Sequence, residues 1–408
     1  MDASKGVSSV GRVIFHSDMN NFFASCECLL NPELKDKPVA VCGDEENRRG
    51  IVLAKNEVAK KHGIKTCDLV WQAKKKCSNL VILSPRHDLY REFSRKAMQL
   101  YSSYTDRIEP FGLDEAWLDM SNIAASLEEG KLFADRLRQQ IKEEIGLTAS
   151  VGVAENKVFA KLGSDMRKPD ATTVISPQNY KDLIWNMSAE NMLFVGDATR
   201  SKLNRAGILT IGDIAKTPQE SLRKLLGKHG DMLWIYANGD DMSEVRRFDE
   251  EEEVKSIGHS VTLGKDISSI EDAKPIICEL CDKVAKRLRK KALKANTVVL
   301  WVRYMDFESY QKQEKLCDPT QLAFDIVNKT LAILSEPGNF KKPIRALGVR
   351  VTDIVGEETK RQQSLFSNED YSKIAALEES LDGIRERFGT SSIRRASSLS
   401  NGKEMEDE

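Results

Sequence analysis

The first 176 residues combine short apolar runs with longer segments in which apolar positions recur at helical spacing. Apolar runs rich in β-branched side chains predict buried strands, and these runs lie at residues 13–18, 37–43 and 147–156. Helical spacing of apolar positions predicts helices at residues 51–62, 89–105 and 126–146. Strands mixed with long helices in this order favour an α+β sheet layered with helices.

A hairpin is predicted between the second and third of these helices. Residues 107–121 read RIEPFGLDEAWLDMS, which is two short alternating segments on either side of Leu113–Glu115. We interpret them as a strand, a tight turn and a second strand.

The pattern changes after Pro177. Residues 180–242 hold short helical pieces interrupted by glycines, which is typical of a small all-helical domain. The acidic, apolar-poor run at 246–256 is the best linker candidate. Beyond it, alternating segments and two helical stretches at 270–294 and 319–335 predict a β-α-β-β-α-β-like order. The tail from about residue 359 is polar, although LEESLDGIRERFG within it can form a helix.

Length and composition set outer limits on the protein. A chain of 408 residues exceeds one ordinary core, so two to four domains are expected. The composition, with 40% apolar and 31% charged residues, is typical of a soluble protein. The sequence has no apolar run of the ~18 residues that a membrane span needs, and its N-terminus does not resemble a signal peptide. We therefore expect a soluble, cytoplasmic protein. The net charge of −1 argues neither for nor against nucleic acid. Cys278 and Cys281 form a lone CxxC in a helical context, which predicts buried thiols rather than zinc ligands.

Three acids are placed at predicted strand ends. Asp18 ends the first strand, and Asp114 and Glu115 lie in the hairpin turn. Acids beside apolar runs are costly to bury without a partner, and converging carboxylates form an oxygen-rich site suited to magnesium. By itself, an Asp-Glu pair on a turn is more often simply solvated.

Three sequence blocks resemble the signatures of Y-family (DinB/UmuC-type) DNA polymerases. They are HSDMNNFFASCECLLNPELKDKPVAVCG, FGLDEAWLDMS and VGVAENKVFAKLGSDMRKPD, in the order and at spacings compatible with the family. Weaker similarity continues through LNRAGILTIGDIA and HGDMLWIYANG, so most of residues 10–395 is covered. The resemblance implies a low-fidelity, template-directed DNA polymerase that acts in translesion synthesis. No additional exonuclease-like set of carboxylates is found in the sequence, so proofreading is not expected.

The same resemblance implies an architecture of palm, fingers and thumb, as in a right hand, plus a little-finger domain. The boundaries that we expect are 1–27 and 87–176 for the palm, 28–86 for the fingers, 177–243 for a helical thumb, 244–253 for a linker, 254–358 for the little finger and 359–408 for the tail.

The resemblance also implies roles for individual residues. Asp18, Asp114 and the Met19 carbonyl are expected to bind two Mg²⁺ ions, with Glu115 at the catalytic ion beside the primer terminus. Two such ions hold the attacking 3′-hydroxyl and the departing pyrophosphate together. The other expected dNTP contacts are Phe23 as a steric gate against the ribose 2′-hydroxyl, Phe22 beneath it, and Lys168 at the triphosphate. Without the motif, Phe22 and Phe23 would be ordinary core aromatics and Lys168 a surface lysine.

Two parts of the sequence depart from the family pattern. In the fingers, many members carry a YEAR-like string whose tyrosine and arginine contact the triphosphate, whereas this chain has Glu57 and Lys60 at those places. A glutamate facing phosphates would be repulsive, so we expect Glu57 to point elsewhere and Lys55, Lys60 or Lys61 to supply the charge. In the thumb, Phe194-Val195-Gly196 stands where family members often have a Gly-x-Gly turn. In one interpretation, the turn at Gly196 donates backbone N–H groups to a DNA phosphate. In the other, it is a plain turn between two helices.

Two further segments suggest partners. Residues 283–296 are the densest basic stretch, in which Lys286, Arg287 and Lys290 contact primer-template DNA or simply form a solvated helix face. The string QQSLF resembles the peptide with which bacterial polymerases bind the sliding clamp, through Gln362, Leu365 and Phe366. In the alternative interpretation, Leu365 and Phe366 pack on the body of the protein. We expect the protein to be a monomer.

Two rival functions remain open at this point. Another two-metal nucleotidyl enzyme, such as a nucleotide cyclase, would need no thumb, little finger or clamp peptide. A DNA- and clamp-binding scaffold without activity would not need intact Asp18, Asp114 and Glu115. Primer extension separates all three possibilities.

Overall fold

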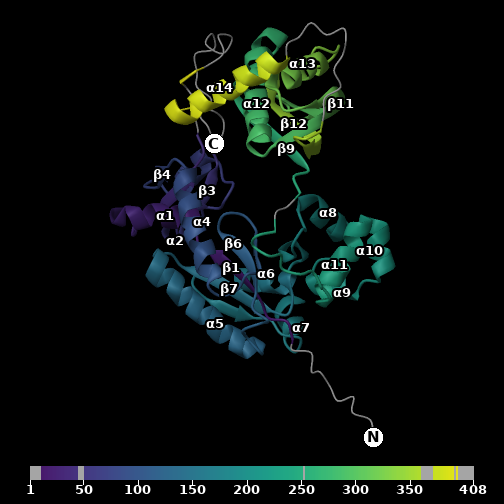
Figure 1. Cartoon of the computed structure of the whole chain (residues 1–408). Helices are drawn as coiled ribbons and strands as arrows, with labels where there is room; N and C mark the ends of the chain where they lie inside the picture. Colours follow the sequence, from purple (N-terminus) through teal and green to yellow (C-terminus); the bar gives the residue numbers. More distant parts are fainter. Residues whose placement is uncertain (1–10, 45–49, 251–252, 360–370, 390–391, 394–408) are drawn as a thin grey trace. The chain divides into compact units, whose positions relative to one another are not determined.

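The computed structural model describes residues 11–44, 50–250, 253–359, 371–389 and 392–393. The chain divides into two compact units near residue 251, and each is described by itself below. Figure 1 shows the elements of both units coloured along the sequence. Among the described residues, no helix has both the length and the apolar character needed to cross a membrane.

A five-stranded sheet in the order β5-β6-β1-β7-β8 forms the centre of the first unit. Its central strand, β1, pairs antiparallel with both β6 and β7, while β7 and β8 are parallel. β1 and β7 are buried along their whole length, which is why they are near-continuous apolar runs in the sequence. The strands are β1 (Ile14–Met19), β5 (Ile108–Pro110), β6 (Glu115–Asp119), β7 (Ala149–Ala154) and β8 (Thr172–Val174).

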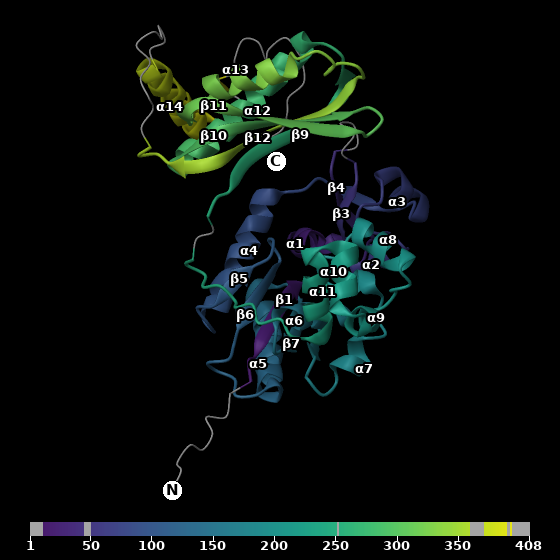
Figure 2. The same ribbon diagram turned by 90° about the vertical axis from the view of Figure 1, so that its right-hand side faces the viewer.

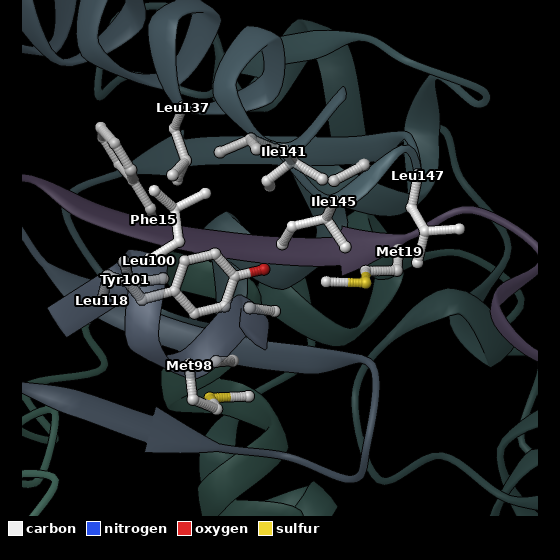
Figure 3. Packing of buried hydrophobic residues seen from close by; sticks show 14 of the residues in the cluster. Phe15, Met19, Met98, Leu100, Tyr101, Leu118, Leu137, Ile141, Ile145 and Leu147 are labelled. Carbon is white, nitrogen blue, oxygen red and sulfur yellow. The ribbon is translucent and has the colours of Figure 1, made fainter. Parts of the chain in front are cut away.

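Helices cover both faces of this sheet. On one face, α4 (His87–Ser102), α5 (Leu127–Gln140) and the π-helical turn η2 (Ile141–Ile145) pack against Phe15 of β1, as Figure 3 shows. On the other face, α6 (Lys157–Met166) lies directly on β7. Gly152 permits this close approach, since a Cβ atom there would fall 1.8 Å from the carbonyl oxygen of Ala160. The contact brings α6 beside the central strands, where its side chains can reach the strand ends.

A smaller three-stranded sheet, β3-β2-β4, follows the first helix α1 (Phe22–Leu30) and the short turn η1 (Pro32–Leu34). The helix predicted over residues 51–62 is wrong in its first half, because Val52–Lys55 forms strand β3. The Asn56 side chain accepts a hydrogen bond from the Ala59 amide at 2.9 Å and so begins a helix only after the strand. The remaining elements are β2 (Val39–Cys42), β4 (Val81–Leu83), α2 (Glu57–Lys61) and α3 (Val70–Lys76).

Residues 180–238 are all helical, as the interrupted pattern predicts. Their core is continuous with the α6 face of the large sheet, through residues such as Ile14, Phe159 and Ile184. The elements are α7 (Tyr180–Ile184), η3 (Ala189–Asn191), α8 (Asp197–Arg205), α9 (Ile211–Lys216), α10 (Gln219–Leu226) and α11 (Lys228–Asn238).

The second unit is a four-stranded antiparallel sheet in the order β11-β10-β12-β9, with the predicted β-α-β-β-α-β chain order. Figure 2 shows α12 and α13 on one face of this sheet. Cys278 and Cys281 are buried thiols in α12, which confirms their interpretation as core residues. The elements are β9 (Ser256–Ile267), α12 (Ile270–Lys290), β10 (Leu293–Tyr304), β11 (Ser309–Thr320), α13 (Ala323–Leu334) and β12 (Ile344–Gly356).

The helix suggested by the tail sequence is present as α14 (Tyr371–Phe388). Glu378 attaches it to the unit: its carboxylate contacts the Arg289 guanidinium and accepts hydrogen bonds from the amides of Ala323 and Phe324 at 2.9 and 3.2 Å. The second arginine branch binds Asp382 at 2.8 Å. A buried acid therefore caps the first turn of α13 from another helix.

Candidate active site

Asp18, Asp114 and Glu115 lie at one edge of the large sheet. Asp18 lies near the end of β1, directly opposite Glu115 at the start of β6. The Met19 amide donates to the Asp114 carbonyl oxygen at 3.0 Å, which fixes the hairpin turn beside the end of β1. Gly112, with φ of +102°, makes that turn possible. Two adjacent strands thus bring together side chains almost 100 positions apart in the sequence.

Burial and mutual repulsion perturb the acids unequally. Desolvation, together with the negative charges of Glu115 and Asp18, raises the pKa of Asp114 to about 6. Desolvation also raises the pKa of Asp18, even though Lys168 opposes the change. Burial would raise the pKa of Glu115 as well, but the proximity of His16 and Lys161 outweighs it and lowers that pKa to about 2. The ionised form of Asp114 is therefore disfavoured at this edge of the sheet.

Two lysines from α6 and the loop after it neutralise part of this charge. The Lys168 ammonium lies 2.8 Å from Asp18 Oδ2 and 3.0 Å from Asp165 Oδ1. Lys161 contacts the Glu115 carboxylate and lies 3.5 Å from both Asp18 Oδ2 and Asp165 Oδ2. Lys168 was expected near the nucleotide, whereas Lys161 was missed. The sequence feature that could have indicated Lys161 is its position four residues before Asp165 on a helix. That spacing is more typical of an exposed ion pair than of an active site.

The acids suit a divalent cation in chemistry, although they do not yet form a closed ligand shell. Over the part of the chain that the structure describes, no three His, Cys, Asp or Glu side chains are gathered as a group that could hold a metal ion. In this arrangement Asp18 and Glu115 make ion pairs with Lys161 and Lys168. Asp114 has no ion-pair partner among the described residues, and carboxylate oxygens are the ligands that Mg²⁺ prefers.

The aromatic pair at the start of α1 lies beside these acids in the chain and is firmly packed. The Phe23 ring stacks on Tyr90 with centroids 4.1 Å apart and planes 10° from parallel. Tyr90 is fully buried, and its hydroxyl donates to Glu27 Oε1 at 2.8 Å. Arg86 holds the same carboxylate, with Nε 2.9 Å from Oε1. Phe22 is buried, whereas Phe23 is only partly covered and keeps an exposed ring surface.

Comparison with known proteins decides the family. Three family models match in chain order: the impB/mucB/samB family at residues 17–165, the DNA polymerase-iota thumb domain at 194–241 and the impB/mucB/samB family C-terminal domain at 254–365. The protein named DNA polymerase IV of Acetivibrio thermocellus is 48% identical over 94% of this chain and 96% of its own length. The chain belongs to the impB/mucB/samB family, the Y family of DNA polymerases.

Other relatives agree with this assignment. The protein named DNA polymerase IV 1 of Bacillus subtilis is 35% identical over 95% of this chain and 93% of its own length. A solved Y-family DNA polymerase chimera is similar in structure, with a TM-score of 0.75 and 25% identity over 84% of this chain and 99% of the chimera. The right-hand Y-family fold with a C-terminal domain is thus confirmed, while the domain boundaries given above stay predictions.

In this Y-family member, Glu57 makes local contacts within the first unit. Its carboxylate accepts a hydrogen bond from the Asn21 side-chain amide at 2.9 Å and lies 3.5 Å from the Lys60 ammonium. Lys55 donates to the Thr66 hydroxyl at 2.8 Å. Lys60 is thus an exposed partner of Glu57, and its expected contact with the triphosphate stays a prediction.

The expected DNA contacts lie on separate elements. Gly196 is the N-cap of α8 with φ of −81°, while Phe194 takes the left-handed conformation at φ of +69°. A Cβ atom at Gly196 would meet open space, so the turn does not require glycine there for packing. Arg287 and Lys290 are exposed on α12, Lys286 is half-buried, and Arg287 also donates to the Gly258 carbonyl at 3.1 Å. Gln362, Leu365 and Phe366 lie outside the described residues.

The open face of the second unit's sheet, opposite α12 and α13, adds basic residues that the sequence analysis did not single out. The strand register aligns Arg303 of β10 with Ser309 and Ala346, and Arg350 of β12 with Val299 and Gly258. Both arginines alternate with core residues of their strands, and the residues that flank them on the neighbouring strands are small, polar or β-branched. In the sequence, both arginines alternate with apolar residues at a period of two, which places them on the face of the strand that points away from the helices.

Proposed function

We propose that this Y-family polymerase copies a DNA template with two Mg²⁺ ions and without proofreading, and that it acts in translesion synthesis. The single observation that carries the proposal is the placement of Asp18, Asp114 and Glu115 at one strand edge. When bound there, Mg²⁺ would supply charge stabilisation for the attacking 3′-hydroxyl and the departing pyrophosphate. Asp18, Asp114 and the Met19 carbonyl would hold the ions, with Glu115 nearest the primer terminus.

The other side chains of the site have positioning tasks in this proposal. Lys168 would bind the incoming triphosphate as a compact positive charge, moving from Asp18 to the phosphates. Phe23, supported by Tyr90, would exclude a ribose 2′-hydroxyl by contact alone. Lys60 and the basic residues of α12 would contribute charge to nucleotide and DNA binding. A sliding clamp would bind Gln362, Leu365 and Phe366, raising the local concentration of a monomeric, cytoplasmic enzyme at DNA.

Primer extension on a fluorescent hairpin with Mg²⁺ and dNTPs tests the proposal. We expect Asp114→Ala and Glu115→Ala to lower the extension rate at least about a hundredfold, since each removes preorganised charge from the reacting atoms. Binding of the hairpin should change little. Asp119→Ala is the matched control, because Asp119 lies on the same strand β6 but opposite Ile14, at the other end of β1.

The control should extend the primer at nearly the wild-type rate. Near wild-type extension by Asp114→Ala or Glu115→Ala would remove the metal assignment. A wild-type protein that binds the hairpin but adds no nucleotide would instead support a non-catalytic scaffold. Templates with and without a damaged base, run in parallel, test the translesion role.

A further inference from the structure

One tryptophan of the first unit lies on the surface, on helix α3. Of the five tryptophans in the chain, all within the described residues, only Trp71 is exposed, with 49% of its surface accessible. Val70 and Ala73 form the buried face of α3 and join the core of the small sheet, so Trp71 points away from that core. Single exposed apolar residues are common on proteins, and the surroundings of the ring therefore decide what it can bind.

The surface around Trp71 is strongly basic. Residues 51–76 hold seven lysines and only two acids, and both acids are already paired. Glu57 lies 3.5 Å from Lys60, and Asp68 lies 2.6 Å from Lys76 in the last turn of α3. Asp68 also accepts a hydrogen bond from the Lys65 amide at 2.7 Å, which ties the preceding loop to α3. The exposed lysines of this segment that form no ion pair among the described residues are Lys61, Lys65 and Lys75.

Lys75 lies one helical turn after Trp71 and contacts its ring. The Lys75 ammonium is 4.8 Å from the ring centroid, which is cation–π geometry. An aromatic face with ammonium groups beside it fits a partner in which flat rings alternate with negative charges. A nucleic acid strand is such a partner, because its bases stack on aromatic side chains while its phosphates bind lysines. A protein partner fits less well, since lysine is depleted in protein–protein interfaces.

The exposed ring also selects between single and double strands. Only an unpaired base has a free face for stacking, because duplex bases are covered by their neighbours. A primer-template has one unpaired stretch, the template ahead of the primer terminus. The patch belongs to the same unit as the acids: Ala73 of α3 shares a core with Ala59 of α2, and Glu57 of α2 accepts a hydrogen bond from Asn21 at the start of α1 at 2.9 Å.

We propose that Trp71 and the lysines around it bind the unpaired template strand ahead of the primer terminus. One base would stack on the Trp71 ring, and Lys75 would bind a neighbouring phosphate. No base preference is expected, since every base has a flat face. The inference rests on the template copying proposed above, but the contact can be measured without any nucleotide addition.

Binding of fluorescent primer-template hairpins to the full-length protein, followed by anisotropy in EDTA without dNTP, tests the proposal. One hairpin has an unpaired 5′ template of about 12 nucleotides, within the range of site sizes of single-strand binding domains, and the other has a single unpaired nucleotide. The ratio of the two affinities isolates the contribution of the unpaired strand. The variants are Trp71→Ala, Trp71→Phe and Lys75→Gln. Leu132→Ala is the matched control, because Leu132 is an exposed apolar residue on α5 of the same unit.

We expect wild type to bind the long overhang about tenfold more tightly than the short one, and Trp71→Ala to lose most of this ratio, since one stacked base contributes about 5- to 150-fold. Trp71→Phe keeps an aromatic face and should keep most of the ratio. Lys75→Gln should lower the slope of log affinity against log salt by about 0.7, the value for one phosphate of a single strand. Leu132→Ala should match wild type.

The proposal is overturned if wild type binds both hairpins equally, or if Trp71→Ala keeps the wild-type ratio; the second result would leave Trp71 to a protein partner. An equal loss for both hairpins would also overturn it, because Trp71 would then contact the duplex. A protein that binds the overhang through Trp71 but does not extend primers would refute the polymerase proposal and not this one.

Discussion

The contact between Tyr90 and Phe23, the proposed sugar gate, allows a quantitative prediction. The ring of Phe23 is only partly covered and stacks on Tyr90 at 4.1 Å, so Tyr90 restricts the positions that the gate can take. An aromatic pair of this geometry contributes about 0.5–1.5 kcal/mol beyond the burial of its area. If Tyr90→Leu removes that restriction, the preference for dNTP over rNTP should fall about 2- to 12-fold, because each 1.36 kcal/mol corresponds to about tenfold in rate.

The assay is the ratio of kcat/KM for dCTP to that for CTP opposite one template guanine. Tyr90→Phe is the matched control: it keeps the stacked ring and removes only the hydroxyl bound to Glu27, so its ratio should stay within about twofold of wild type. Phe23→Ala, which removes the gate itself, should lower the ratio further than Tyr90→Leu. If Tyr90→Leu keeps the wild-type ratio while Phe23→Ala does not, the stacking argument is wrong. An unchanged ratio in Phe23→Ala would remove the gate assignment altogether.

Two further predictions concern hydrogen bonds that hold elements in place. Glu378→Gln should loosen α14 by about 3 kcal/mol, the low end for breaking a buried ion pair, since Arg289 keeps a second acid. Hydrogen exchange in α14 should then quicken about 150-fold, whereas the exposed neighbour variant Glu379→Gln should leave it unchanged. Equal protection in both variants would contradict this. The buried Asn20 side chain accepts a hydrogen bond from the Asp170 amide at 2.8 Å and so holds the loop that carries Lys168. Asn20→Ala should therefore raise the KM for dNTP about tenfold in steady-state kinetics. Asn20→Asp keeps an acceptor and should retain a KM close to that of wild type.

The strands that carry the three acids were predictable because two local signals agreed, whereas the roles expected of the acids came from the family resemblance. An apolar run marked β1 as buried, and the alternating segments placed Asp114 and Glu115 in a hairpin turn; in the structure β6 begins at Glu115. Residues 51–62 show the limit of the same method. A short apolar run such as Ile51–Ala54 fits a buried strand or a helix equally well by periodicity, and only the cap formed by Asn56 separates the two.

Side chains that act through tertiary contacts were not predictable. His16 and Ser164 are 148 positions apart and meet only because α6 lies against β7 at Gly152. In the sequence, His16 is one polar residue in an apolar strand, and nothing in that pattern indicates Ser164 as its partner. Likewise, only the strand order of the structure shows that Arg303 and Arg350 share the open face of one sheet.

The balance of charge at the strand edge explains how acids this deeply buried are tolerated. Asp18, Asp114, Glu115 and the more exposed Asp165 bring four carboxylates, whereas Lys161 and Lys168 bring two ammonium groups. Both lysines have a raised pKa: burial lowers it, but the surrounding carboxylates outweigh burial, so the ammonium groups stay charged. Burial and the neighbouring Glu115 and Asp18 disfavour the ionised form of Asp114 and raise its pKa to about 6. Carboxylates that outnumber the nearby ammonium groups repel one another, and an added cation at this edge would relieve that repulsion, in agreement with the Mg²⁺ binding proposed above.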